Sequence, residues 1–262
     1  MSDSLNRADK LYHIGLDGSV SAKYAILPGD PGRVEKIAEF LDNPRFVTSN
    51  REYTTYVGTV NGENVLVTST GIGGPSTAIA VEELYKIGVR NFIRVGTCGG
   101  MQEEVIGGDV VVATAAIRME GTSREYAPIE YPAAADFEVT SALVKACAES
   151  GVIYHTGVVQ SKDSFYGQHD PGRMPVGRTL ADNWEAWIKC GCMASEMECA
   201  ALFTVCNILR ARSGAVLSVV WNQERAKKGL PNPESHNTQN AIKAAVLAIG
   251  IMIENERKGE YA

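Results

Sequence analysis

The chain has 262 residues, 45% of them hydrophobic, which is enough to bury the core of one large domain over residues 1–262, with two smaller domains as the alternative on length alone. Its 31 acidic and 25 basic residues give a net charge of −6, and the basic residues are scattered, which argues against a nucleic-acid partner. The first residues form no apolar secretory segment, and no stretch approaches the roughly 18 apolar residues of a membrane span. We therefore expect a cytoplasmic protein with no membrane partner.

Short apolar runs rich in β-branched residues alternate along the chain with helical patterns. The first half predicts strands at 25–29, 64–70, 91–97 and 110–114, and helices at 34–42 and 76–88. The second half predicts helices at 138–151, 183–191, 198–210 and 237–258, and strands at 155–161 and 215–221. This alternation is typical of a largely parallel sheet covered by helices, so the predicted fold class is α/β.

Six cysteines are present, and none shows C-x-x-C spacing. Most of them lie in apolar patterns, and we interpret them as reduced, small hydrophobic residues. Cys190 and Cys192 could bind a metal ion, but no histidine or second cysteine pair accompanies them, so core packing is the favoured interpretation.

Two regions are candidates for function because they are long and irregular, namely 120–132 and 167–178. A second guide is that ligands of parallel sheets gather beyond the carboxyl ends of the strands. The residues that follow the predicted strands are rich in glycine, arginine and hydroxyl side chains, so we expect the site there.

Two glycine-rich turns join a strand to a helix. The turn 29–33 lets the backbone approach a ligand and places the guanidinium of Arg33 near a helix N-terminus, which is the outline of an anion site, although such a turn is often only a turn. The turn 70–77 lacks the P-loop lysine and the G-x-G-x-x-G spacing. A nucleoside triphosphate or a dinucleotide is therefore disfavoured.

Arg94 lies inside the apolar strand 91–97, where a charge needs a partner. The partner is either a ligand or a buried carboxylate, and the sequence leaves both open. Gly96 and Thr97 follow and would present a backbone amide and a hydroxyl to the same ligand.

Five segments, PGDPGR, REYTT, TGIGGPST, RVGTCGG and SEMECAA, together resemble the nucleoside phosphorylase-I family. The likeness extends from about His13 to Asn222, and within the family the segments look most like members that act on uridine. The resemblance implies a single α/β domain with a mixed central β-sheet flanked by helices. It also implies a pentosyltransferase that converts uridine and inorganic phosphate reversibly to uracil and ribose 1-phosphate.

The resemblance assigns a phosphate site to Gly29, Arg33, Arg94 and Thr97, with Arg51 reaching in from the neighbouring subunit. The arginines and Thr97 form the predicted catalytic set, because they align the phosphate that attacks the anomeric carbon. No cofactor is implied beyond phosphate as co-substrate.

The ribose site implied by the resemblance consists of Glu196, Met197 and Glu198, with His13 crossing the subunit boundary. On the residues alone, carboxylates at a helix start are commonly dipole partners, and His13 would be a surface histidine near the chain terminus. The shared site implies a homo-oligomer built from dimers and assembling as a hexamer. A potassium ion at the dimer interface is implied at Glu52, Ile72 and Ser76.

The base site implied by the resemblance uses Phe165 to stack on uracil and the amide of Gln168 to pair with its edge. The better-known bacterial pattern has two arginines where this chain has Asp170 and Gln223. Candidates for a replacement cation are Arg173, Arg178, Arg225 and Lys162.

Purine-specific relatives place an aspartate after the equivalent of strand 215–221, and Asn222 and Gln223 stand there instead, which favours a pyrimidine. The alternatives are a purine nucleoside phosphorylase or nucleosidase of the same superfamily, or a non-catalytic nucleoside-binding protein.

Overall fold

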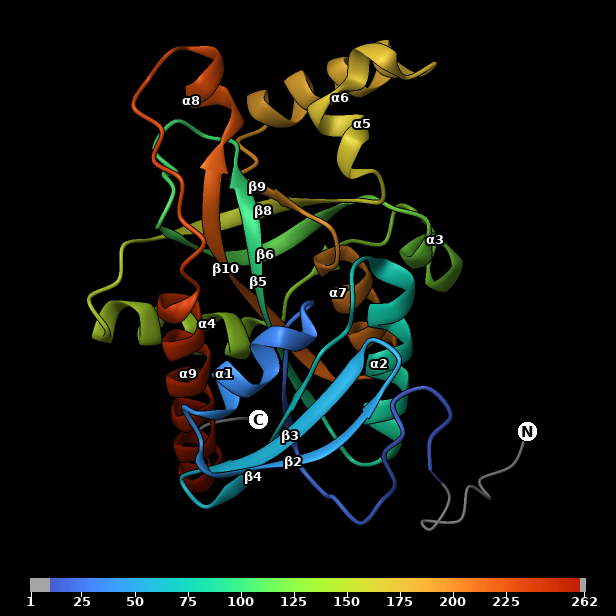
Figure 1. Ribbon diagram of the computed structural model, residues 1–262, viewed down its shortest axis with the longest axis vertical. Helices are drawn as coiled ribbons and strands as arrows, with labels where there is room; N and C mark the ends of the chain where they lie inside the picture. The colour runs from blue at the N-terminus through green and yellow to red at the C-terminus, as the bar shows by residue number, and fades with distance from the viewer. Residues whose placement is uncertain (1–9, 260–262) are drawn as a thin grey trace.

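A ten-stranded sheet with helices on both faces forms the centre of the computed structural model, which describes residues 10–259 (Figure 1). Its strands are β1 (Tyr24–Leu27), β2 (Asp42–Asn50), β3 (Tyr53–Val60), β4 (Glu63–Thr68), β5 (Asn91–Gly100), β6 (Val110–Met119), β7 (Ala133–Ala134), β8 (Tyr154–Lys162), β9 (Ala194–Glu196) and β10 (Arg212–Asn222). Their order is β10-β6-β8-β9-β5-β1-β4-β3-β2, and β7 pairs with β6. The α/β class with a mixed sheet is confirmed.

The sheet closes on itself at one end. β5 pairs with both β9 and β10, and β10 pairs in turn with β6, so β5, β10, β6, β8 and β9 form a ring. Within residues 10–259, five strand pairings are parallel and five are antiparallel. The expectation of a largely parallel sheet was therefore wrong, because the helix-linked strands supply the parallel pairings while hairpins and the ring closure supply antiparallel ones.

The helices form two layers, each packed on one hydrophobic cluster. Apolar residues of α2 and α7 belong to one cluster, and those of α1, α4 and α9 belong to the other. Figure 1 shows α5, α6 and α8 gathered at the far end of β5 and β10. The helices are α1 (Val34–Ala38), α2 (Gly74–Lys86), α3 (Thr122–Tyr126), α4 (Phe137–Glu149), α5 (Phe165–His169), α6 (Gly177–Lys189), α7 (Cys199–Ile208), α8 (Gln223–Lys227) and α9 (Gln239–Lys258), with short 3-10 turns at Pro31–Arg33 and Pro171–Arg173.

The hairpin of β2 and β3 was not predicted. β2 lies at the edge of the sheet and is mostly exposed, so it lacks the apolar alternation that marks a strand. The predicted helix 34–42 accordingly ends early, at Ala38, and β2 begins at Asp42. At the turn of the hairpin Arg51 has a positive φ of 56°, which is uncommon for a residue with a side chain.

The connection 120–132 is organised by one buried arginine. Arg118 donates to the hydroxyl and carbonyl oxygens of Ser123 at 2.9 and 2.7 Å, and to the carbonyl oxygens of Ala127 and Tyr131 at 2.8 and 2.6 Å. These bonds satisfy carbonyl groups that a loop would otherwise leave unpaired. The connection 120–132 is thus ordered by hydrogen bonds to Arg118 rather than irregular.

Five of the six cysteines are buried and Cys190 is exposed, so the core interpretation holds for all but one of them. Among residues 10–259, no three His, Cys, Asp or Glu side chains are grouped as metal ligands would be. No helix in this part of the chain has the length and hydropathy needed to cross a membrane.

Candidate active site

A cavity of about 780 Å³ opens at the carboxyl ends of β1, β4, β5 and β10. It collects nine of the residues predicted for the phosphate, ribose and base sites, although the sequence distributes them over four separate segments. The nine are Gly29, Arg33, Arg94, Thr97, Phe165, Gln168, Glu196, Met197 and Glu198. The connection 120–132 does not line it, whereas Phe165, Gln168 and His169 of α5 do.

Arg94 faces this cavity and is paired with protein carboxylates as well. Its Nε donates to Glu196 Oε2 at 3.2 Å, and its Nη2 donates to the carboxylate of Glu198. Burial alone would lower the pKa of Arg94, but the carboxylates of Glu198 and Glu196 raise it above its ordinary value, so the guanidinium stays charged. A Cβ atom at Gly96 would lie 2.8 Å from Nη2, so glycine at this position leaves room for the guanidinium to lie along the strand.

Glu196 and Glu198 differ in the number of hydrogen-bond acceptor positions that remain open to a ligand. Glu196 accepts from four donors, namely Ser161 Oγ, Arg94 Nε and the backbone amides of Glu198 and Cys199. A carboxylate has about four acceptor positions, so Glu196 is fully occupied. Glu198 accepts from Arg94 and from the amide of Gly73 at 2.5 Å, which leaves two positions open. Glu198 is therefore the carboxylate that can accept hydrogen bonds from a bound hydroxyl.

The turn that carries Arg33 is fastened to the turn after β4. The amide of Gly71 donates to the carbonyl of Gly29 at 2.9 Å, and Asp30 holds its own turn by accepting from Gly32 N at 2.8 Å. Burial lowers the pKa of Arg33, and the nearby charge of Arg94 acts in the same direction. Two guanidinium groups therefore face this cavity together, each also near a carboxylate, and both can donate hydrogen bonds to an anionic ligand.

The opposite end of the cavity is built from α5 and the strands beside it. Gln168 donates from Nε2 to Gln223 Oε1 at 3.3 Å and accepts at Oε1 from Ser195 Oγ at 2.7 Å. The ring of Phe165 is half exposed and lies 4.4 Å from that of His169, centroid to centroid. This end offers an aromatic face and an amide, which suits a flat polar ring. Ser195 was not singled out in the sequence, because a serine in an apolar stretch carries no distinctive signal.

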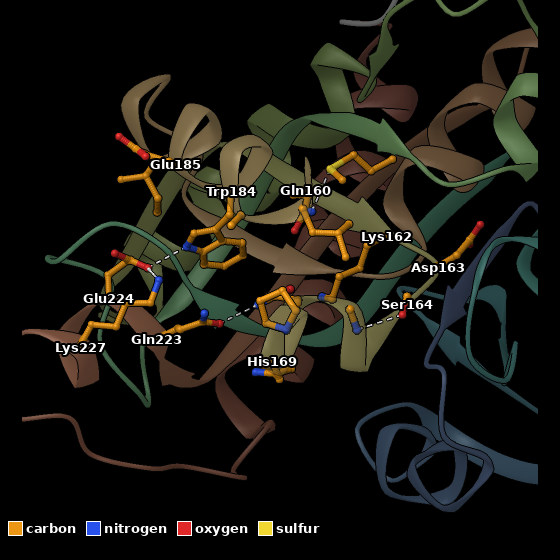
Figure 2. Close-up of a pocket in the computed structure, with 17 residues that line it drawn as sticks. Gln160, Lys162, Asp163, Ser164, His169, Trp184, Glu185, Gln223, Glu224 and Lys227 are labelled. Atoms are coloured by element: carbon orange, nitrogen blue, oxygen red, sulfur yellow. Dashed lines mark hydrogen bonds and ion pairs between the residues drawn. The ribbon is translucent and has the colours of Figure 1, made fainter. Parts of the chain in front are cut away.

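A second cavity, of about 600 Å³, adjoins this end and lies under α6. Figure 2 shows Trp184, Glu224 and Lys227 at one end of it and Lys162 and Ser164 at the other. Lys227 is paired with Glu224 at 2.7 Å, and Trp184 donates to the same carboxylate at 2.7 Å. Lys162, Gln168 and His169 line both cavities and so form the wall between them.

His13 and Arg51 do not line either cavity. They lie close to each other instead. Asn50, next to Arg51, donates to the carbonyl of His13 at 2.7 Å, and the guanidinium of Arg51 lies 5.7 Å from the ring centroid of Tyr12. His13 Nδ1 is 2.7 Å from Glu83 Oε1, so its ring has one nitrogen left for another contact.

Comparison with known proteins shows the family of the chain. The family model described as the phosphorylase superfamily matches residues 23–253, which is most of the chain. The chain belongs to the phosphorylase superfamily. Its similarity to individual members of the superfamily extends over nearly their whole length.

Three relatives illustrate this similarity, and the first two of them carry the same name. The uridine phosphorylase of Treponema pallidum (strain Nichols) is 55% identical over 94% of this chain and 95% of its own length. The uridine phosphorylase of Escherichia coli (strain K12) is 44% identical, with 91% and 96% covered. A guanosine phosphorylase of Halorubrum lacusprofundi is 38% identical, with 86% and 92% covered. The superfamily thus includes relatives named for a pyrimidine nucleoside and for a purine nucleoside.

Proposed function

We propose that the chain is a uridine phosphorylase, a pentosyltransferase that converts uridine and inorganic phosphate reversibly to uracil and ribose 1-phosphate. The observation that carries this is that one cavity brings together three kinds of group: the guanidinium groups of Arg33 and Arg94, the carboxylate of Glu198, and the ring of Phe165 with the amide of Gln168. These three kinds of group suit phosphate, ribose and base. Several uridine phosphorylases at 42–55% identity support the same activity.

The phosphate end performs the attack. Arg33, Arg94 and Thr97, with the backbone at Gly29, hold the phosphate so that one of its oxygens faces the anomeric carbon. That oxygen bonds to C1′ as the C1′–N1 bond breaks, through a transition state that resembles an oxocarbenium ion. The negative phosphate stabilises the developing ribosyl cation, and no covalent enzyme intermediate is needed.

The other groups position the nucleoside. Glu198 accepts hydrogen bonds from the ribose hydroxyls, and Met197 packs under the sugar. Phe165 stacks on uracil and the Gln168 amide pairs with its edge. Glu196 was predicted at the ribose, but all its acceptor positions are filled, so we assign it the role of holding Arg94 and the start of α7.

The test is uracil release from uridine with and without inorganic phosphate, with inosine and thymidine as competing substrates. We expect release that depends on phosphate and a preference for uridine. Release without phosphate would indicate a nucleosidase, and preferential cleavage of inosine would indicate a purine phosphorylase. Binding without turnover would indicate a nucleoside-binding protein.

Asn222 argues against the purine activity, because its side chain is held in place by donating to the carbonyls of Gln102 and Val105, both at 2.8 Å.

We propose further that the active enzyme is a homo-oligomer of dimers, assembled as a hexamer, in which Arg51 and His13 complete the neighbour's site. Their common position outside the cavity of their own chain supports this. We propose that Glu52, Ile72 and Ser76 offer oxygen ligands to a potassium ion at the dimer interface, and the 3.4 Å distance between Ser76 Oγ and the carbonyl oxygen of Ile72 supports this for two of the three. We keep potassium binding there, and the cytoplasmic location, as predictions.

Mixing two inactive variants tests the shared site. Arg51→Ala and Arg94→Ala should each be inactive alone, while a hybrid dimer has one site with both changes and one site with neither. Equal mixing with full subunit exchange should restore about a quarter of the wild-type activity, because about half of the dimers are hybrids with one intact site. No recovery, with exchange demonstrated by differently tagged subunits, would place Arg51 outside the site.

A further inference from the structure

Uracil leaves as an anion, so the base end of the site needs a positive group that the two substitutions in the bacterial pattern, Asp170 and Gln223, do not supply. Three of the four candidate cations lie away from the base end of the site. Arg173 pairs with Asp170 at 3.0 Å, Arg178 is 95% exposed, and Arg225 donates to the carbonyl oxygens of Pro231 and Glu103. None of these arginines lines either cavity.

Lys162 is the candidate that the fold brings to the base. It is the last residue of β8, is only 6% exposed, and lines both cavities, as Gln168 does. Figure 2 shows it among the residues that line the second cavity. Its ammonium group donates to Ser195 Oγ at 2.7 Å, and among residues 10–259 no carboxylate oxygen lies within 4.0 Å of it. An ammonium group has three donors, so two of them are open to a ligand.

Ser195 couples this ammonium group to Gln168. Its hydroxyl oxygen lies 2.6 Å from Gln160 Oε1 and 2.7 Å from Gln168 Oε1 while accepting from Lys162. A hydroxyl has one proton, so it can donate to only one of the two amide oxygens at a time. Gln168 can therefore turn its oxygen to a ligand while Ser195 keeps its bond to Gln160.

This pair of a donor and an acceptor suits the imide edge of uracil, where a carbonyl oxygen stands next to an N–H group. The Lys162 ammonium group and Gln168 Oε1 contact the same hydroxyl, that of Ser195, so a donor and an acceptor lie near each other in the wall of the cavity. The N3–H group of uracil can donate to Gln168 while O4 accepts from Lys162.

We propose that Lys162 donates a hydrogen bond to O4 of uracil and stabilises the negative charge that uracil acquires as its bond to ribose breaks. This rests on the proposed function. The electron pair of the C1′–N1 bond stays on uracil, a phosphate oxygen forms the new bond to C1′, and the uracil anion takes its proton from solvent after it leaves. Lys162 keeps its proton throughout and acts by charge.

The titration of Lys162 gives this role a pH dependence. Burial lowers the pKa of Lys162 to about 8, against the attraction of Glu196 and Glu198. The titratable groups that face it from neighbouring elements are Glu196, Glu198, Cys98 and His169. Since the charged form stabilises the anion, kcat/KM should be full below this pKa and fall as the pH rises through it.

The experiment compares Lys162→Met and Lys162→Arg with the wild type, using uridine and 5-fluorouridine, whose base is the better leaving group. For Lys162→Met we expect kcat/KM for uridine to fall about 100-fold. The loss with 5-fluorouridine should be smaller, since its anion needs less help, and the KM for phosphate should stay within about twofold. Lys162→Arg should keep more activity and lose the fall near pH 8, because arginine stays charged. Lys227→Met, which changes a lysine lining only the second cavity, is the matched control and should behave as wild type.

Equal losses with both substrates and an unchanged pH profile would show that Lys162 only supports Ser195, and would overturn the proposal. Near-normal activity of Lys162→Met would do the same. If Lys162→Met fails to fold, the pH profile of Lys162→Arg still decides. Failure of the proposed function itself is distinct, because the wild type would then release no uracil in a phosphate-dependent way.

Discussion

Replacing Arg94 by alanine should lower kcat/KM for uridine phosphorolysis at least about a hundredfold, on the order of 3 kcal/mol of transition-state stabilisation. The guanidinium is the charge that the sheet itself places in the cavity, fixed by Glu196 and Glu198 so that little reorganisation is needed when phosphate binds. Steady-state rates at varied phosphate and uridine concentrations would measure the loss. We expect kcat/KM for phosphate to fall more than kcat/KM for uridine.

Stability must be separated from catalysis in this variant. Removing Arg94 leaves two buried carboxylates without their partner, which costs about 3–5 kcal/mol of unfolding free energy. Arg212 provides a matched control, because it pairs with Glu138 at 2.6 Å and with Glu256 at the opposite end of β10. Arg212→Ala should lower stability while leaving kcat/KM near normal at temperatures where it is folded. Near-normal turnover of Arg94→Ala would contradict the phosphate assignment.

Replacing Glu198 by glutamine should lower kcat/KM for uridine. The expected loss of transition-state stabilisation is about 2–3 kcal/mol, since hydrogen bonds to a charged group contribute roughly that much. The loss should be smaller for 2′-deoxyuridine, which lacks one of the hydroxyls that the carboxylate accepts from. The decisive measurement is therefore the ratio of kcat/KM for the two nucleosides, which the variant should bring closer to one.

Glu196→Gln is the comparison for this prediction. Because Glu196 has no open acceptor position, its replacement should disturb Arg94 and stability but leave the ratio between uridine and 2′-deoxyuridine unchanged. If instead Glu196→Gln alters the ratio and Glu198→Gln does not, the two carboxylates have the opposite roles.

Much of this site was predictable because its residues follow buried strands. The apolar run around Arg94 and the glycine turn before Arg33 marked strand ends, and parallel strand ends meet at one edge of a sheet. The roles proposed for Glu196 and Lys162 were not predictable, since they depend on which donors surround a carboxylate and which cations are already paired. The hairpin of β2 and β3 was missed because an exposed edge strand needs no hydrophobic pattern.

The phosphate end and the base end are carried by different parts of the fold. In the proposed site, turns after β1 and β4 and the strand β5 hold the phosphate, whereas the end of β8, α5 and the end of β10 hold the base. The base specificity of such an enzyme can therefore change during evolution while the phosphate site stays the same. This fits a superfamily with relatives named for uridine and for guanosine. For the same reason, residues 162–178 are the segment to vary in engineering a new base specificity, with the phosphate site left unchanged.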